Sequence, residues 1–271
     1  PTNNAAAYEY YLRAQYLYQN LKDLSDIEIM RELLIKSIEL DDSFIYAKIY
    51  LSMSYLHTSD YAKCIELSRV ILNKINSIET KDYDDILNHL YLNFALAYYY
   101  TSDNNTSLNY LDKSIEISLK LGDKYSMINA LNLKGLIHNS LGNLDQSLAL
   151  YMQCLKLERS LDGQTSYLIN NIGLIYQDRG DYGRALESMN SAIDLFKQED
   201  EKIWLSNALA NKGRIYTILG EYNEAINYLK ESLSIRQEMG DKQLISFSLK
   251  ALGQSFYYKR DYEQSIKYLD Q

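Results

Sequence analysis

One short block of residues recurs six times along this chain of 271 residues, and it constrains the fold more than any other feature. Its clearest copy is LGEYNEAINYL, Leu219 to Leu229, where Gly220 ends one helix and Tyr222 begins the next. The remaining copies lie at 59–68, 102–111, 142–151, 180–189 and 260–269. A period of about 40 residues is typical of arrays of helical hairpins, in which each hairpin buries its apolar face by stacking on its neighbours.

Four positions are equivalent in every copy, counted from a small residue in the first helix of each pair. The small residue is Ser52, Ala95, Gly135, Gly173, Gly213 and Gly253. An aromatic ring or an imidazole follows three residues later, at Tyr55, Tyr98, His138, Tyr176, Tyr216 and Phe256. The turn comes seven residues after the small position, at Ser59, Ser102, Gly142, Gly180, Gly220 and Arg260. A second small residue comes twelve residues after the first small residue, at Cys64, Ser107, Ser147, Ala185, Ala225 and Ser265. These spacings predict two antiparallel helices that touch at the small residues, with the rings packed beside the contact and a left-handed glycine at the turn.

The composition supports a helical protein with a substantial core. Hydrophobic residues make up 46% of the chain, and its single proline is Pro1, so no internal proline interrupts a helix. The net charge of −8, with scattered Lys and Arg, argues against nucleic acid as the main partner. No run of apolar residues is long enough for a membrane span, and the first ten residues do not resemble a signal peptide. We therefore predict no membrane partner and a cytoplasmic protein, and a periplasmic sensor region is the alternative that the sequence leaves open.

No set of residues forms a recognisable catalytic or metal centre. The chain has no His-Glu-x-x-His pair and no phosphate-binding glycine loop. His138 occupies the aromatic core position, whereas His57 and His89 fall on first helices. Cys64 and Cys154 stand where other repeats carry Ser or Ala, so we expect them to be small buried core residues. The sequence therefore predicts a protein that is not an enzyme and that has no cofactor and no metal.

The repeat resembles the tetratricopeptide repeat in its long form. The resemblance rests on the small residue, the ring three positions on, turns such as GDYGRAL at 180–186, and the small residue that follows. It implies an all-α, right-handed α-solenoid of about seven helical hairpins, whose first helices line a concave groove. The expected units form a single superhelix over 1–271, with the last unit incomplete. Their ranges are about 4–40, 43–76, 82–121, 123–161, 164–199, 201–239 and 241–271.

Two stretches resemble tetratricopeptide regions of bacterial signalling proteins. The combination of AYEYYLRAQYLY with IELDDSFIYAKIYLSMSYL is similar to such regions in nucleotide cyclases, protein kinases and transcription activators. The linkers LGDK at 121–124 and MGDK at 239–242 are similar to those in sensor histidine kinases. Because the final block stops in mid-motif, we expect the chain to be a piece of a larger protein.

Helical spacing predicts which side chains reach the groove. Asparagine is a poor helix former, so its recurrence on one face suggests amides that bind a peptide backbone. In peptide-binding members of the family, Asn at the position of Asn93, Asn171 and Asn211 commonly holds the ligand backbone. Arg214 and Lys250 add cations on the same side, where they could take a carboxylate. The predicted peptide-binding residues are Asn93, Asn132, Asn171, Asn211, Arg214 and Lys250.

The groove of the early repeats is predicted to be apolar, which suits packing against a helix. Its predicted residues are Tyr46, Ile49, Met53, Leu92, Leu96 and Tyr99. The sequence therefore favours a protein- or peptide-binding scaffold that is part of a bacterial signalling protein. The alternative is a self-assembly module that forms a homodimer through the repeat ends and regulates an attached catalytic or DNA-binding domain.

Overall fold

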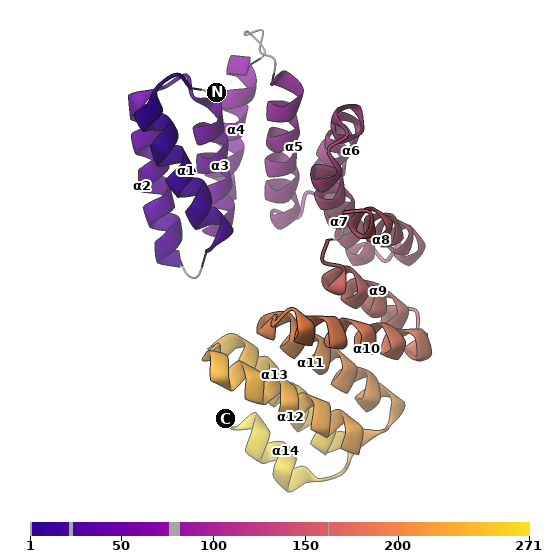
Figure 1. The fold of residues 1–271 in the computed structure, drawn as a ribbon. Coiled ribbons are helices and arrows are strands. Elements are labelled where there is room, and N and C mark those ends of the chain that lie inside the picture. The colour runs from indigo at the N-terminus through magenta and orange to yellow at the C-terminus, as the bar shows by residue number, and fades with distance from the viewer. Residues whose placement is uncertain (1, 22–23, 76–81, 162) are drawn as a thin grey trace. The chain divides into compact units, whose positions relative to one another are not determined.

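The computed structural model describes residues 2–21, 24–75, 82–161 and 163–271 (Figure 1). The described residues form 14 α-helices and no β-strand, so the predicted all-α fold is confirmed. The chain divides into two compact units, Pro1–Ser140 and Leu141–Gln271. The first unit contains α1 (Ala5–Gln19), α2 (Leu24–Leu40), α3 (Ile45–His57), α4 (Tyr61–Ile75), α5 (Tyr83–Tyr100), α6 (Asn104–Leu121) and α7 (Lys124–Ser140). The second contains α8 (Leu144–Arg159), α9 (Ser166–Asp178), α10 (Tyr182–Gln198), α11 (Lys202–Leu219), α12 (Tyr222–Met239), α13 (Lys242–Tyr258) and α14 (Tyr262–Leu269).

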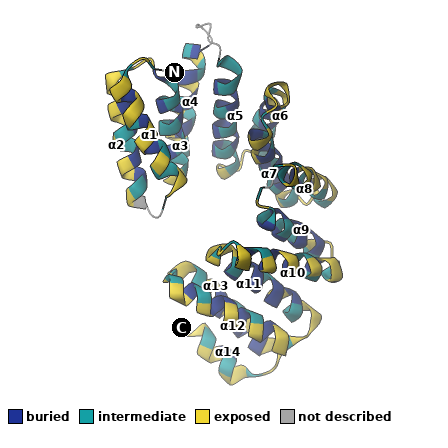
Figure 2. Ribbon diagram, viewed as in Figure 1, coloured by how far each residue is buried: buried dark blue, intermediate teal, exposed yellow. Residues whose placement is uncertain are grey.

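Successive helices within each unit pack as antiparallel pairs. In the first unit α1 packs on α2, α3 on α4 and α5 on α6. In the second unit α9 packs on α10, α11 on α12 and α13 on α14. Figure 2 shows that most helices bury one face and expose the other, as expected for hairpins that stack on their neighbours. The boundary between the units falls between α7 and α8, the two helices of the fourth expected hairpin.

The glycines at the small positions of the second unit are required by close helix contact. A Cβ added at Gly213 of α11 would lie 2.7 Å from Cγ of Leu229 on α12. A Cβ at Gly253 of α13 would lie 2.6 Å from Cγ of Leu269 on α14. Both distances are shorter than real carbon–carbon contacts, so a larger residue would require the leucine side chain or the partner helix to move.

Serine makes a hydrogen bond across the helix pair at two of the second small positions. Ser107 Oγ of α6 donates to the carbonyl oxygen of Ala95 of α5 at 2.7 Å. Ser265 Oγ of α14 donates to the carbonyl oxygen of Gly253 at 2.8 Å. These bonds join the first and second small positions, twelve residues apart, and therefore show the same helix register in both units.

At three of the six aromatic positions, Tyr98, Tyr216 and Phe256, the ring stacks on a second ring from the partner helix. The ring centroids of Tyr98 and Tyr110 lie 5.9 Å apart, with an angle of 7° between the ring planes. Phe256 and Tyr268 repeat this stack at 5.3 Å and 9°. Offset stacking of this kind contributes about 1 kcal/mol beyond the burial of apolar area. The partner ring stands fifteen residues after the small position.

All six turn positions adopt the left-handed conformation, although only three are glycine. Gly142, Gly180 and Gly220 have φ angles of 76°, 75° and 82°, and Ser59, Ser102 and Arg260 have φ angles of 59°, 64° and 67°. The hydrogen bonds follow the Schellman pattern: Gly220 N donates to Thr217 O, and Glu221 N donates to Tyr216 O. The turn therefore keeps the predicted left-handed conformation even in the three repeats that lack glycine there.

Replacing Ser102 with glycine is expected to stabilise the protein. The left-handed conformation costs a residue with a Cβ about 1–2 kcal/mol, and glycine loses about 0.5–1 kcal/mol through its greater freedom in the unfolded chain. We expect Ser102→Gly to raise the free energy of unfolding by about 0.5–1 kcal/mol and Ser102→Ala to leave it unchanged, as measured by urea denaturation.

Gly180→Ala is the matched reverse change. No atom lies within 4 Å of a Cβ added at Gly180, so only backbone strain opposes the substitution. We expect Gly180→Ala to lower the free energy of unfolding by about 1 kcal/mol. Equal stability of the Ser102→Gly and Ser102→Ala variants would contradict this account of the turns.

Candidate protein-binding groove

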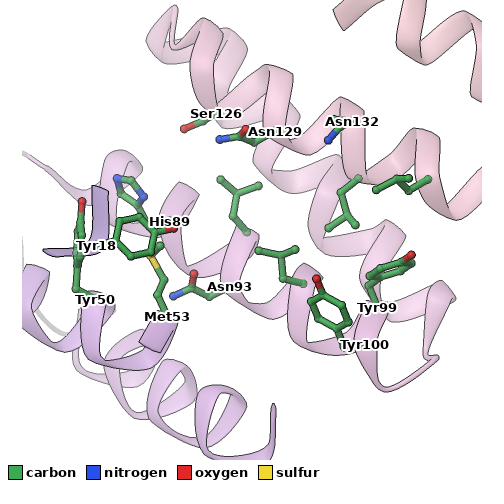
Figure 3. Close-up of a pocket in the computed structure, with 14 residues that line it drawn as sticks. Tyr18, Tyr50, Met53, His89, Asn93, Tyr99, Tyr100, Ser126, Asn129 and Asn132 are labelled. Carbon is green, nitrogen blue, oxygen red and sulfur yellow. The ribbon is translucent and has the colours of Figure 1, made fainter. Parts of the chain in front are cut away.

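The first unit contains a groove of about 450 Å³ formed by its first helices (Figure 3). Tyr18 of α1 lies at one end, and α3, α5 and α7 supply the other lining residues. Those from α3 and α5 are Tyr50, Met53, His89, Leu92, Asn93, Leu96, Tyr99 and Tyr100. Those from α7 are Ser126, Asn129, Asn132, Leu133 and Leu136. The groove therefore lies where the sequence places one, on the first helix of each pair.

Helical periodicity explains how α5 builds the floor of the groove. Leu92, Leu96 and Tyr99 follow one another at intervals of four and three residues, which places them on one face of the helix. Ala95, three residues after Leu92 and four before Tyr99, lies beside this face and contacts Ser107 of α6. Close packing of Ala95 on α6 therefore fixes the direction in which the Leu92 face points, and leaves that face partly buried.

The groove lining is largely uncharged and apolar. None of its lining residues is Asp, Glu, Lys or Arg, in a chain of which 24% is charged. One acidic residue lies close to the lining residue His89: Oδ1 of Asp85 is 4.0 Å from Nε2 of His89. Tyr46 OH donates to Oδ2 of the same Asp85 at 2.6 Å, and burial together with this carboxylate raises the pKa of Tyr46. A ligand in the groove therefore meets rings, aliphatic side chains and amides.

Three asparagines supply the main polar groups. Asn93 is only 2% exposed, and its Nδ2 lies 3.5 Å from the carbonyl oxygen of Ile49 and from Ser52 Oγ, to which it donates. Its amino group thus joins α5 to α3. Asn129 is exposed, whereas Asn132 is half-buried and its shielded Oδ1 accepts no hydrogen bond from the described residues. Figure 3 shows Asn129 and Asn132 on the same helix, across the groove from Met53. Asn132 therefore carries an unsatisfied acceptor, which a peptide N–H reaches only if the side chain rotates.

Two of the predicted apolar groove residues lie elsewhere. Ile49 is fully buried in a core cluster with Leu90 and Phe94, because α5 packs across this part of α3. Tyr46 lies outside the groove lining and is bonded to Asp85. Ile49 is therefore covered and not open to a ligand, because spacing within one helix does not reveal which part its neighbour covers. Tyr46 as a ligand contact stays a prediction. The lining residues Tyr18, Tyr50, Leu133 and Leu136 were missed, although their spacing on the first helices could have indicated them.

The predicted amide and cation residues of the second unit lie on its first helices. Asn171 on α9 and Asn211 on α11 are half-buried, and Arg214 and Lys250 are exposed. Asn171 Oδ1 lies 3.4 Å from Nδ2 of Asn170, from which it accepts a hydrogen bond. The two cations are available to solvent and to a ligand.

Neither cysteine forms a disulfide, and both are fully buried, as predicted. Burial is the main cause that raises the pKa of Cys154 to about 12, and the nearby Glu158 carboxylate adds to it. Burial likewise raises the pKa of Cys64. The described residues contain no group of three metal-ligating side chains. No helix within the described ranges is long and apolar enough to cross a membrane.

Neither thiol is expected to react while the protein is folded. A thiol with a pKa of about 12 is almost entirely protonated at pH 8, and reagents reach it only when the hairpin opens. We expect labelling of Cys64 and Cys154 by a chromogenic disulfide reagent to be at least about a hundredfold slower in buffer than in denaturant. Rapid labelling of one equivalent in buffer would contradict this burial.

Paired helices stacked around small-residue contacts define a helical-repeat protein, a class that typically serves as a scaffold for protein interactions and is generally not catalytic. The sequence profile of the tetratricopeptide repeat matches residues 85–160, 164–238 and 204–271. The chain therefore belongs to the tetratricopeptide repeat family. A comparison with curated protein sequences finds no match.

Solved structures of low sequence identity share the fold. A Signal Transduction ATPase with Numerous Domains from Pyrococcus horikoshii, which has a tetratricopeptide repeat sensor, is 17% identical with a TM-score of 0.73, over 98% of this chain and 46% of that chain. Aspartyl phosphate phosphatase F from Bacillus subtilis is 15% identical with a TM-score of 0.68, over 96% of this chain and 77% of that chain. A Rap protein complexed with Competence and Sporulation Factor is 14% identical with a TM-score of 0.67, over 100% of this chain and 86% of that chain.

Proposed function

We propose that this chain is the partner-binding part of a signalling protein and that the groove of its first unit binds an apolar protein segment. The observation that carries the proposal is the uncharged lining of the groove on α3, α5 and α7. A groove lined by Met, Leu and Tyr side chains suits the apolar face of a helix or the side chains of an extended peptide. The amides of Asn129 and Asn132 suit its backbone.

The chemistry of the lining also indicates which segments should be rejected. A charged side chain placed between Leu92, Leu96 and Tyr99 would lose its hydration, and no lining carboxylate or ammonium group would compensate it. The groove should therefore select partners whose central residues are aliphatic or aromatic. Selection of this kind works by penalising the wrong ligand as well as by favouring the right one.

The structural relatives are consistent with a signalling role. One of them is named as a complex with Competence and Sporulation Factor, and another is named for a tetratricopeptide repeat sensor. This chain spans 46% of the latter, so in that protein a comparable array is one part of a longer chain. Membership of a larger bacterial signalling protein and a cytoplasmic location stay predictions for this chain.

Leu96→Lys is expected to abolish selective binding in the groove. The test is a selection from a displayed library of random peptides, followed by calorimetric titration of the recovered sequences. We expect recovered peptides to be rich in aliphatic and aromatic residues, and Leu96→Lys to weaken their binding by about tenfold or more because it removes apolar contact and places a charge in the groove.

Val70→Lys is the matched control for this experiment. Val70 lies on α4, away from the groove lining, and is 57% exposed, so the same lysine should leave both binding and the circular dichroism spectrum unchanged. Recovered peptides that bind the Leu96→Lys variant as tightly as the unaltered chain would refute the groove as the binding site.

We further propose that Asn171, Asn211, Arg214 and Lys250 form a second contact surface, which takes backbone amides and an acidic group. Their position on α9, α11 and α13 supports this, as does the exposure of the two cations. The same selection tests it with the combined variant Asn171→Ala, Asn211→Ala and Arg214→Ala. We expect this variant to lose binding of peptides that carry an acidic residue, while its own helicity stays unchanged. If those peptides bind the variant with unaltered affinity, the second contact surface is excluded.

A second candidate function is self-assembly through α14. This helix exposes Tyr262, Ile266 and Leu269 by 55%, 59% and 55%, and their spacing places them along one face. An exposed apolar face of this kind suits contact with a second copy of the chain. The groove proposal does not depend on it.

Ile266→Lys is expected to convert a self-associating chain into a monomer. Sedimentation velocity over a range of concentrations should show a dimer for the unaltered chain and for Val70→Lys, whose exposed fraction of 57% matches that of Ile266. The Ile266→Lys variant should sediment as a monomer, because a lysine on the face would have to lose its hydration on association. A monomeric unaltered chain at every concentration would exclude this assembly.

A further inference from the structure

The second unit contains a small cavity between the start of α9, the end of α10 and the start of α11. Its volume is about 120 Å³, which corresponds to about four water molecules at ~30 Å³ each. A space of this size admits a small head group and not a nucleotide or a sugar. The lining residues are Gln164, Ser166, Tyr167, Phe196, Glu199, Glu201 and Trp204.

Aromatic rings form part of the cavity wall. Trp204 is 46% exposed, so its indole is open to a ligand, whereas Phe196 behind it is buried. Their ring centroids lie 6.4 Å apart with an angle of 15° between the planes, so one side of the indole packs against Phe196. Tyr167 OH donates to Glu158 Oε1 at 3.0 Å, so the third ring is also held in place. Fixed rings recognise a ligand at a lower cost in conformational entropy than mobile ones.

Two carboxylates of the lining have no basic partner within the described part of the chain. Ser166 Oγ donates to Glu199 Oε2 at 2.6 Å, which orients this carboxylate without neutralising it. Glu201 precedes α11, and its side chain makes no capping hydrogen bond there. The lysines next in sequence pair elsewhere: Lys197 lies 3.7 Å from Glu231, and Lys202 lies 3.9 Å from Glu238.

The helix ends around the cavity do not cancel this negative charge. The first turns of α9 and α11 each contribute roughly half a positive charge, and the last turn of α10 contributes roughly half a negative one. The helix ends therefore sum to about half a positive charge, whereas Glu199 and Glu201 carry two full negative charges. The cavity therefore favours a cation.

We propose that this cavity binds an alkylammonium head group, with Trp204 and Tyr167 facing the cation and Glu199 and Glu201 balancing its charge. Tryptophan is the best aromatic partner for a cation, and quaternary ammonium groups are recognised by rings combined with acidic side chains. The same chemistry suits a free quaternary amine and the methylated side chain of a lysine on a partner protein. The proposal is independent of the groove in the first unit.

Trp204 is the single tryptophan of the chain, so its fluorescence reports on the cavity directly. Tetramethylammonium chloride is titrated with excitation selective for tryptophan, and sodium chloride at equal ionic strength serves as the reference. We expect a saturable change in Trp204 emission with tetramethylammonium and none with sodium. The combined Glu199→Gln and Glu201→Gln variant should bind about tenfold more weakly.

The combined Glu231→Gln and Glu238→Gln variant is the matched control, because these carboxylates pair with Lys197 and Lys202 outside the cavity lining. It should bind as the unaltered chain does. Choline and a trimethyl-lysine amide then distinguish the two possible ligands. Tighter binding of choline indicates that the natural ligand is a free amine, and tighter binding of the lysine derivative indicates a methylated lysine of a partner protein. A response to tetramethylammonium that equals the response to sodium, or one unchanged by the Glu199 and Glu201 substitutions, would overturn the proposal.

Discussion

The close approach of two helices at a pair of small residues is the contact on which the rest of this structure depends. At Gly213 and Gly253 the partner helix fills the space that a Cβ would occupy. At Ser107 and Ser265 the hydroxyl donates to the carbonyl oxygen of the opposite small residue. Because this contact sets the register of each pair, it also determines which face of the first helix is turned away from the core.

The groove of the first unit is a consequence of that register. The face of α5 beside Ala95 carries Leu92, Leu96 and Tyr99, and the equivalent faces of α3 and α7 complete the lining. The repeat dictates the position of these side chains but not their chemistry, because nothing in the pair contact depends on them. The same fold can therefore present an uncharged groove in one unit and amides with cations in the other. In the proposed function, these variable side chains select the partner.

The turns show how a repeat tolerates a locally unfavourable residue. Ser59, Ser102 and Arg260 adopt the left-handed conformation in which other repeats place glycine. Each accepts a strain on the order of 1 kcal/mol, which the hydrogen bonds of the turn and the packing of the following helix offset. Tertiary packing thus outweighs local preference at these positions, and the hairpin geometry is preserved.

The spacing of small, aromatic and turn residues by itself determined the all-α fold, the helix pairs and the helices that carry the groove, because helical geometry converts sequence intervals directly into faces. It could not determine which of those residues a neighbouring helix covers. Ile49 and Met53 share a face of α3, yet α5 buries Ile49 and leaves Met53 in the groove lining. The cavity around Trp204 likewise depends on the ends of three helices meeting, a juxtaposition decided by tertiary packing and not by any interval within one helix.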